Sequence, residues 1–215
     1  MYASFKDQHE YLLEGALVAH TKGASEPYFK NLVAKAKDIA NDHRINYRSQ
    51  LISLSAHIFS YWSLKSMNSF VCGSISDADD FITACDYLMK PHAAQVVAIR
   101  YILNFRHEYY RVLQNHFVEI LTGEGKSIAL GVTAIILAMM NCNVACICYS
   151  SYLSERDAVA FRSMFESFEV LPFIDYSTAK IACGNVYNQG VDIRDLSESI
   201  AWGRTTEYNN SPNEG

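Results

Sequence analysis

Apolar residues recur every three or four positions along much of the first hundred residues, as they do on one face of an α-helix. The segment from residue 25 to residue 44 has this spacing. Pro27 falls in its first turn, and Ser25 is the candidate N-cap. Its apolar positions are Phe29, Leu32, Val33, Ala36, Ile39 and Ala40. The pattern predicts an amphipathic helix that packs one face against other elements.

The helical spacing continues in the segments that follow. Residues 45–67 place six apolar side chains on one face, namely Tyr47, Leu51, Leu54, Ile58, Tyr61 and Leu64. Residues 76–89 begin with a serine and early acidic side chains, which favour the start of a helix. Pro91 ends that helix and begins another over residues 91–103. We therefore predict an all-helical N-terminal region spanning residues 1–90.

After residue 115 the pattern changes to short apolar runs that alternate with helical segments. Residues 116–122, 143–150 and 170–177 are candidate strands, and helices are predicted over residues 128–140 and 154–168. Strands that alternate with helices are typical of a parallel sheet covered on both faces. The predicted fold class is therefore α/β, with an incomplete parallel sheet of the RecA-like P-loop NTPase type preceded by the helical region.

Three features of the C-terminal half concern a helix start, a weak strand and the end of the chain. Ser154 and Asp157 have the spacing of a capping box at the start of the helix over 154–168, whose inner face would hold Ala158, Phe161, Phe165 and Phe168. Pro172 weakens the third strand candidate. A further helical stretch runs toward Ile200, and the polar tail over residues 203–215 is expected to be disordered.

The sequence "TGEGKS" contains a glycine-rich turn between a candidate strand and a candidate helix. Gly123 and Gly125 permit a tight loop whose backbone N–H groups converge on an anion, aided by the positive end of the following helix. Lys126 would reach the phosphates, and Ser127 would offer a hydroxyl to Mg²⁺. Ile120 stands where the P-loop pattern has its first glycine. A glycine-rich strand-to-helix turn without ligand therefore stays open as the alternative.

The uncharged run from residue 128 to residue 149 is long enough to span a membrane. Gly131 lies inside it, and Asn141 and Asn143 interrupt it. A division at Asn141 gives a helix of ordinary length followed by a buried parallel strand, which is expected to be continuously apolar. We favour this division, with a membrane span as the alternative.

Composition narrows the classes of function. Half of the residues are hydrophobic, which is sufficient for a buried core, and the net charge of −5 argues against a nucleic-acid partner. The N-terminal segment lacks the apolar core of a signal peptide, so we expect a cytoplasmic protein whose cysteines are reduced. The six cysteines show no CxxC pair and no histidine at ligand spacing, which favours buried free thiols over a metal site.

The motifs from residue 88 to residue 200 carry a family resemblance. "EILTGEGKSIAL" resembles the nucleotide-binding motif of the SecA preprotein translocase motor, whose P-loop also lacks the first glycine. "SSYLSERDA" resembles the same family's next segment, with Tyr152, Leu153, Arg156, Asp157 and Ala158 matching. "IDYST" is similar to a later strand, with Tyr176 and Thr178 matching. "PHAAQVVAIRYIL" resembles the region whose glutamine contacts adenine.

This resemblance implies a partial SecA DEAD-like nucleotide-binding domain over residues 91–202, with ATP and Mg²⁺ as ligands. The implied binding residues are Gln95, Thr122, Gly123, Glu124, Gly125, Lys126 and Ser127, with Ser127 also a metal ligand. Arg156 and Asp157 resemble a motif that contacts the second half of the motor, although a capped helix start explains them equally well. In this family ATP drives protein translocation, so a polypeptide substrate, a second motor half and peripheral membrane association are the implied partners and setting.

The sequence departs from the family in its acidic element. It contains no D-E-x-D motif, which in the family holds Mg²⁺ and activates water, and no second motor domain. We therefore assign no catalytic residue and expect a fragment of a motor, which binds ATP without turning it over alone. Two alternatives stay open: a non-catalytic interaction module on a degenerate nucleotide-binding fold, and a fragment of a DEAD-box-type helicase.

Overall fold

The computed structural model describes residues 2–42, 44–70, 88–103 and 116–188. Over these residues the protein is mostly helical, with a short parallel sheet of two strands. The helices of the N-terminal half are α1 (Tyr2–Thr21), α2 (Ser25–Asn41), α3 (Tyr47–Phe70) and α5 (Ala93–Ile102). The C-terminal half contains α6 (Lys126–Met139), β1 (Val144–Cys148), α7 (Ser151–Ser167), the 3₁₀ turn η1 (Leu171–Phe173), β2 (Ile174–Thr178) and α8 (Ala179–Asn188).

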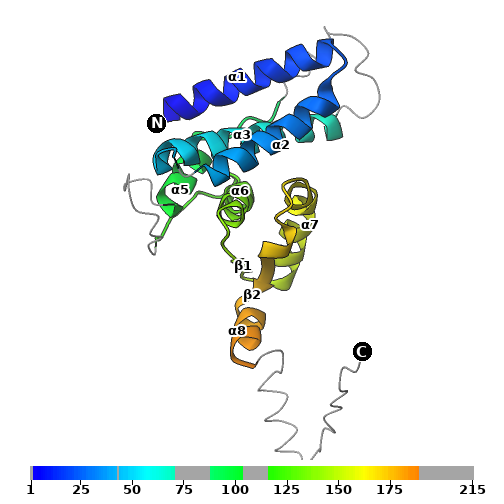
Figure 1. Ribbon diagram of the computed structural model, residues 1–215. Helices are drawn as coiled ribbons and strands as arrows, with labels where there is room; N and C mark the ends of the chain where they lie inside the picture. Colours follow the sequence, from blue (N-terminus) through cyan, green and yellow to red (C-terminus); the bar gives the residue numbers. More distant parts are fainter. Residues whose placement is uncertain (1, 43, 71–87, 104–115, 189–215) are drawn as a thin grey trace, which may run out of the picture.

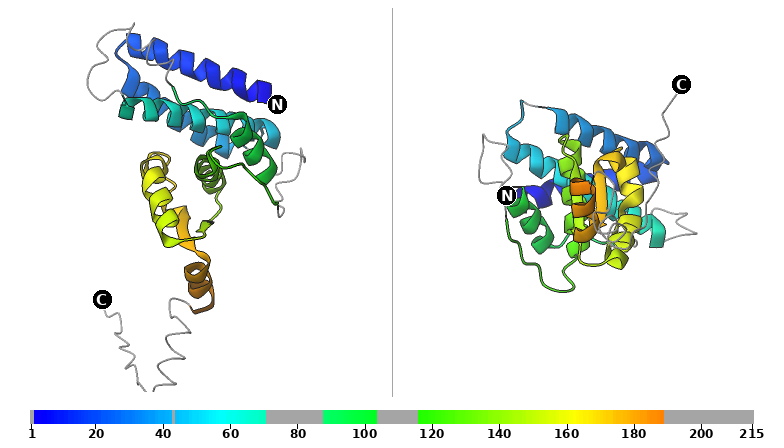
Figure 2. Two further views of the ribbon diagram at one scale, coloured as in Figure 1. Left: turned by 180° about the vertical axis from the view of Figure 1, so that it is seen from behind. Right: turned by 90° about the horizontal axis from the view of Figure 1, so that it is seen from below.

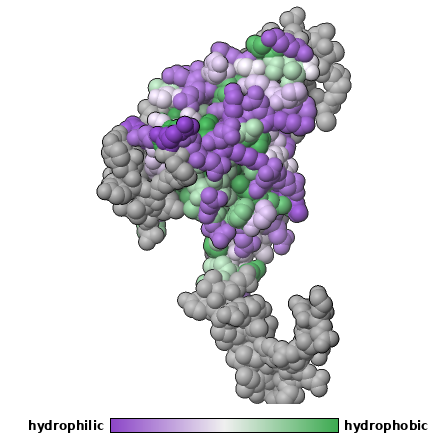
Figure 3. Space-filling model, viewed as in Figure 1, coloured by the Kyte–Doolittle hydropathy of each residue, from purple (hydrophilic) through white to green (hydrophobic). Residues whose placement is uncertain are grey.

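The elements lie in successive layers (Figure 1). Helices α1, α2 and α3 form a helical layer at one end of the molecule, with α5 beside it. Helices α6 and α7 lie between this layer and the sheet, and α8, which contacts both strands, lies beyond them on the side away from the helical layer (Figure 2). The visible face of the helical layer is largely hydrophilic, with apolar patches below it (Figure 3). The face of the sheet that holds Cys146 and Tyr176 packs against α7, whereas Ala145, Ile147 and Asp175 on the other face are exposed.

The predicted helices of the N-terminal half are confirmed where the structure describes them. The apolar face of α2 is buried at Leu32, Ala36 and Ala40. Helix α3 is buried on more than the predicted face, because α1, α2 and α6 all contact it. The six predicted positions of α3 are each buried, namely Tyr47, Leu51, Leu54, Ile58, Tyr61 and Leu64. Helix α3 is thus the centre of the helical layer.

The predicted N-cap of α2 is wrong by one position. Ser25 is the first helical residue, and Ala24 occupies the N-cap without a side-chain hydrogen bond. The Ser25 Oγ instead lies 3.1 Å from Nδ1 of His20, in the last turn of α1. The turn between α1 and α2 is short. The Ser25 hydroxyl therefore contacts a side chain of α1 and not the free backbone N–H groups at the start of α2.

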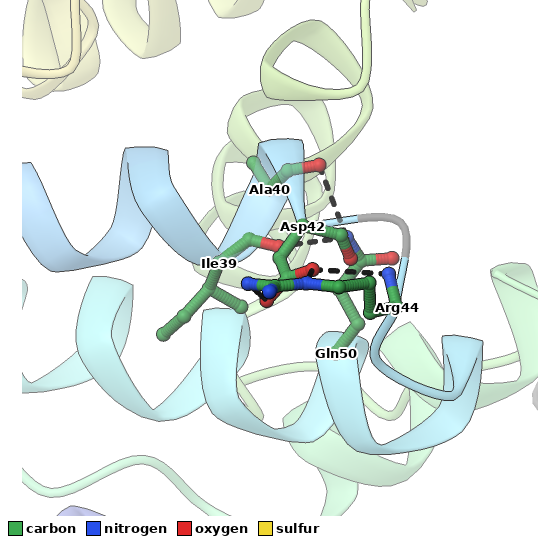
Figure 4. Close-up of polar contacts among 5 residues, drawn as sticks. All are labelled: Ile39, Ala40, Asp42, Arg44 and Gln50. Carbon is green, nitrogen blue, oxygen red and sulfur yellow. Dashed lines mark hydrogen bonds and ion pairs between the residues drawn. The ribbon is translucent and has the colours of Figure 1, made fainter.

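A buried glutamine completes the other end of α2 (Figure 4). The amide nitrogen of Gln50 in α3 donates to the carbonyl oxygens of Ile39 at 2.7 Å and Ala40 at 3.0 Å. These carbonyls belong to the last turn of α2. The carbonyl groups of a last turn have no N–H partners within their own helix. Asp42 follows and forms an ion pair with Arg44 at 2.9 Å. Because Gln50 is fully buried, this polar contact determines where α2 ends relative to α3.

The uncharged run divides at Asn141, as predicted. Helix α6 ends at Met139, Asn141 adopts a left-handed backbone with φ of 64°, and the Cys142 N–H bonds to the Leu137 carbonyl at 3.0 Å. This is the geometry of a terminated helix. Strand β1 follows and pairs in parallel with β2, from Val144 opposite Ile174 to Cys148 opposite Thr178. Among the described helices, none is both long and apolar enough to cross a membrane.

Two strand predictions need correction. Residues 116–121 form no strand, and Phe117 is fully exposed. A strand requires a hydrogen-bonded neighbour, and the two described strands pair with each other and not with this segment. The third candidate begins later than predicted, because Pro172 lies in η1 and lacks the N–H that a strand needs. Strand β2 therefore starts at Ile174.

The helical layer and the α/β part share one hydrophobic core. Tyr61 of α3 makes an edge-to-face contact with Phe168 at 5.2 Å between ring centroids, and its hydroxyl donates to the Ser167 Oγ at 2.7 Å. The boundary at residues 90 and 91 stays a prediction. The helix predicted over 76–89 falls outside the described residues up to position 87, as do the stretch from 189 toward Ile200 and the tail over 203–215.

Candidate nucleotide site

The glycine loop, residues 121–126, connects an exposed segment to α6. Its turn is closed by a hydrogen bond from the Glu124 N–H to the Leu121 carbonyl at 3.2 Å. Gly123 and Gly125 both adopt left-handed backbone, with φ of 91° and 76°. This region is open to glycine and strained for most other residues, so both glycines are needed for the shape of the loop. Gly125 is the N-cap of α6.

The first residues of α6 present unbonded groups to the loop. The N–H groups of Ile128 and Ala129 bond to the Gly125 carbonyl, whereas those of Lys126 and Ser127 precede the first intrahelical bonds. The Lys126 side chain is exposed and has no hydrogen-bond or ion-pair partner among the described residues. Thr122 is exposed at the tip of the loop. Free amides, a helix N-terminus and a free ammonium together form an electropositive position.

Gln95 lies against this loop, although it comes from α5. Its side chain is buried at 6% exposure, and its Nε2 donates to the Glu124 carbonyl at 3.0 Å. Its Oε1 accepts from the backbone N–H of His92 at 3.1 Å. Gly125 leaves the space that Gln95 occupies, because a Cβ at this position would collide with the Gln95 Nε2. The structure therefore brings the predicted adenine-contacting residue and the predicted phosphate loop together.

A second contact joins α5 to the loop. Nδ1 of His92 lies 2.7 Å from Oε2 of Glu124. His92 is the N-cap residue of α5, and Glu124 belongs to the motif that the family resemblance implies. The histidine and its partner lie far apart in sequence, so no local pattern indicated this pair.

A polar cluster lies behind the loop, where α6 meets the first turns of α7. The Ser127 Oγ donates to Oδ2 of Asp157 at 2.8 Å, and Asp157 is 7% exposed. Arg156 contacts Oδ1 of the same carboxylate through Nε at 2.9 Å and Nη2 at 2.6 Å. Its Nη2 also lies 3.3 Å from the Ser127 Oγ. The hydrogen bond to Asp157 raises the pKa of Arg156 further, so the guanidinium stays charged.

The predicted capping box at the start of α7 is therefore wrong. The helix begins one turn earlier, at Ser151, and its N-cap is Ser150, whose Oγ accepts from the Leu153 N–H at 3.3 Å. Ser154 and Asp157 are both inside the helix and buried. Because the helix starts at Ser151, Asp157 lies in its second turn and faces α6. Its carboxylate accepts a hydrogen bond from the Ser127 hydroxyl and does not cap the helix.

The metal chemistry of this site is limited to oxygen donors. Among the described residues there is no group of three or more histidine, cysteine and acidic side chains that could hold a metal ion. The Ser127 hydroxyl with a buried carboxylate behind it suits Mg²⁺, which typically takes few protein ligands and completes its shell with phosphate oxygens and water. The residues therefore fit Mg²⁺ that arrives with a nucleotide.

The described cysteines are free thiols on or near β1 and in α8. They are Cys142, Cys146, Cys148 and Cys183. Cys146 is 2% exposed, and burial raises the pKa of its thiol to about 11. Such a group is an inert core residue and not a nucleophile. Cys72 and Cys85 lie outside the described residues.

Comparison with known proteins identifies the family of this half of the chain. Residues 87–188 match the family model described as the SecA DEAD-like domain. No curated protein and no solved structure matches the sequence. The matched range begins just before α5 and ends with α8, so it contains all of the predicted binding residues. A DEAD-like domain implies a RecA-like fold, which agrees with two parallel strands connected through helix α7. The match over residues 87–188 supports a SecA-like N-terminal motor domain in this part of the chain.

Proposed function

We propose that this chain binds ATP at the glycine loop. At the level of the family, the SecA DEAD-like domain is the ATP-binding part of a motor for protein translocation. The observation that carries the proposal is the contact between Gln95 and the loop. The side chain implied to contact adenine and the backbone implied to hold phosphate are hydrogen-bonded to each other. Gln95 belongs to α5 and Glu124 to the loop before α6, and the sequence separates them by 29 residues.

The proposed mode of binding follows from the groups at the start of α6. The free N–H groups of Lys126 and Ser127 and the positive end of the helix attract the phosphates. Lys126 adds a mobile positive charge. Mg²⁺, when bound, neutralises phosphate charge, and Ser127 is the residue that would hold it. Thr122, Gly123, Glu124 and Gly125 would surround the phosphates with backbone groups.

Hydrolysis is not part of the proposal. Phosphoryl transfer requires a group that orients the attacking water, and the sequence has no D-E-x-D motif to supply one. We propose binding by this chain alone, and turnover only with a second motor half. A polypeptide substrate and a cytoplasmic or peripheral membrane setting are proposals at the level of the family.

A titration with a fluorescent ATP analogue tests the proposal. Lys126→Ala is expected to weaken binding about 10- to 100-fold, because a hydrogen bond to a charged group contributes about 1.5–3 kcal/mol. Lys180→Ala is the matched control, since Lys180 is an exposed lysine in α8 of the same domain. Equal affinity of wild type and Lys126→Ala would overturn the proposal.

A non-catalytic interaction module is the second candidate, and the missing acidic motif favours it. Release of inorganic phosphate separates the candidates. We expect no release above background from the purified chain, with or without RNA. Rapid release by the chain alone would refute the claim that it lacks a water-activating group, and stimulation by RNA would instead indicate a DEAD-box-type helicase.

A further inference from the structure

The buried carboxylate of Asp157 has a specific relation to the proposed nucleotide site. It comes from α7, whereas the glycine loop and Ser127 belong to the start of α6. The Ser127 hydroxyl donates its hydrogen bond to Asp157 at 2.8 Å. That proton points at the carboxylate, and the Arg156 Nη2 donates a hydrogen bond to the same Ser127 oxygen at 3.3 Å. One of the two lone pairs of the hydroxyl oxygen is therefore left for a cation.

Arg156 occupies one side of the same hydroxyl. Its Nη2 lies 3.3 Å from the Ser127 Oγ and 2.6 Å from Oδ1 of Asp157. The hydroxyl therefore lies between a negative and a positive side chain. A cation bound to the Ser127 oxygen would be attracted by the Asp157 carboxylate, which is hydrogen-bonded to the same hydroxyl. The same cation would be repelled by the nearby Arg156 guanidinium.

We propose that Asp157 is a positioning residue for the magnesium-bound nucleotide. It orients the Ser127 hydroxyl and supplies the negative charge behind it, while Arg156 opposes the cation and limits its affinity. The carboxylate that would attract a phosphate-bound cation is thus that of Asp157, in the second turn of α7. This inference rests on the proposed binding of ATP at the glycine loop.

The competing explanation is structural. The pair of Arg156 and Asp157 could serve the packing of α7 on α6 and nothing else. In that case the two partners are equivalent, and removal of either one has the same effect on the site. If Asp157 acts on a cation, the two substitutions have opposite effects, because the partners carry opposite charges.

The experiment measures the affinity for a fluorescent ATP analogue in EDTA and over a range of Mg²⁺ concentrations. The readout is the ratio of the two dissociation constants, without and with Mg²⁺. Asp157→Asn keeps the shape and removes the charge, and is expected to lower this ratio at least about fivefold. Arg156→Gln is expected to raise this ratio by a similar factor. The electrostatic energy between a unit charge and a nearby divalent ion is large enough for this change even at the dielectric constant of water. Ser127→Ala is the reference for a lost Mg²⁺ contact.

The outcomes separate this inference from the proposed function. Opposite changes in the ratio support it. Changes in the same direction, or none, overturn it and leave a structural pair. If Asp157→Asn does not fold by circular dichroism, Arg156→Gln alone decides, and an unchanged or lower ratio overturns the inference. If wild type binds better than Lys126→Ala in EDTA, the proposed function stands whatever the ratio does. Absence of binding by wild type overturns both.

Discussion

The contact between Gln95 and Gly125 gives a test of how the glycine loop is held. Gly125→Ala introduces a Cβ at a position where φ is 76° and where the Cβ would collide with the Gln95 Nε2. Gln95 is buried and bonded at both ends of its amide, so it cannot move aside without loss. Gly123→Ala is the matched control. Its φ is 91°, but its Cβ would meet no atom within 4 Å.

The expected magnitudes follow from these contacts. Left-handed backbone at alanine costs about 1–2 kcal/mol, which is the whole expected effect of Gly123→Ala. Gly125→Ala carries the same strain and also displaces Gln95 from two hydrogen bonds, each worth about 0.5–1.5 kcal/mol. We therefore expect Gly125→Ala to lower the free energy of unfolding by about 2–5 kcal/mol. Gln95→Ala removes the side chain with which the new Cβ would collide. In the Gln95→Ala protein, Gly125→Ala is therefore expected to lower the free energy of unfolding no more than Gly123→Ala does.

Urea denaturation followed by circular dichroism measures these free energies. The double-mutant cycle of Gly125→Ala with Gln95→Ala is expected to give a coupling of about 1–2 kcal/mol, since the two sites are in contact. A matching cycle with Gly123→Ala is expected to give none. A coupling below about 0.5 kcal/mol in the first cycle, or equal couplings in both, would refute the claim that Gln95 is packed against Gly125.

Three further predictions concern the core and its titration. Gly131→Ala is expected to destabilise by about 1–2 kcal/mol, because its Cβ would lie 2.8 Å from the buried Phe161 ring and the strain outweighs the gain in helix propensity. Thermal melts check this, and in a Phe161→Leu background the sign is expected to reverse. Burial lowers the pKa of His9 to about 4, below its value of about 6.5 in the unfolded chain. The unfolded state therefore binds the proton first, and about 3 kcal/mol of stability is expected to be lost as pH falls from 6.5 toward 4, with His9→Gln as the control in urea titrations. Iodoacetamide at pH 8 is expected to modify the exposed Cys183 well before Cys146, whose thiolate is only about one part in a thousand, and peptide mass spectrometry checks the order. Equal rates in the native protein would contradict the buried position of β1.

Local periodicity was sufficient for most of the secondary structure. The apolar stripe of α2, the six positions of α3 and the division at Asn141 are properties of short segments, and the sequence predicted them. The segment over 116–122 has the same apolar character as β1 but forms no strand. Strand formation depends on a neighbouring chain, which no local pattern specifies.

The site was partly predictable for the same reason. The glycines, Lys126 and Ser127 lie in one short motif, so the sequence indicated a phosphate loop. The contact of Asp157 with Ser127 was not predicted, because the spacing of Asp157 from Ser154 fits a capping box. Its actual partner is on another helix, and the helix start at Ser151 decides which way it faces. Long-range polar pairs of this kind follow from packing.

Helix α5 is attached at both of its ends. At its start, Gln95 and His92 bond to Glu124 in the glycine loop. At its end, the Leu103 carbonyl accepts a hydrogen bond from the buried Tyr47 hydroxyl of α3 at 3.1 Å. A ten-residue helix is a rigid connection about 15 Å long. The glycine loop and the first turn of α3 are therefore joined through α5 by side-chain hydrogen bonds at both ends of one short helix.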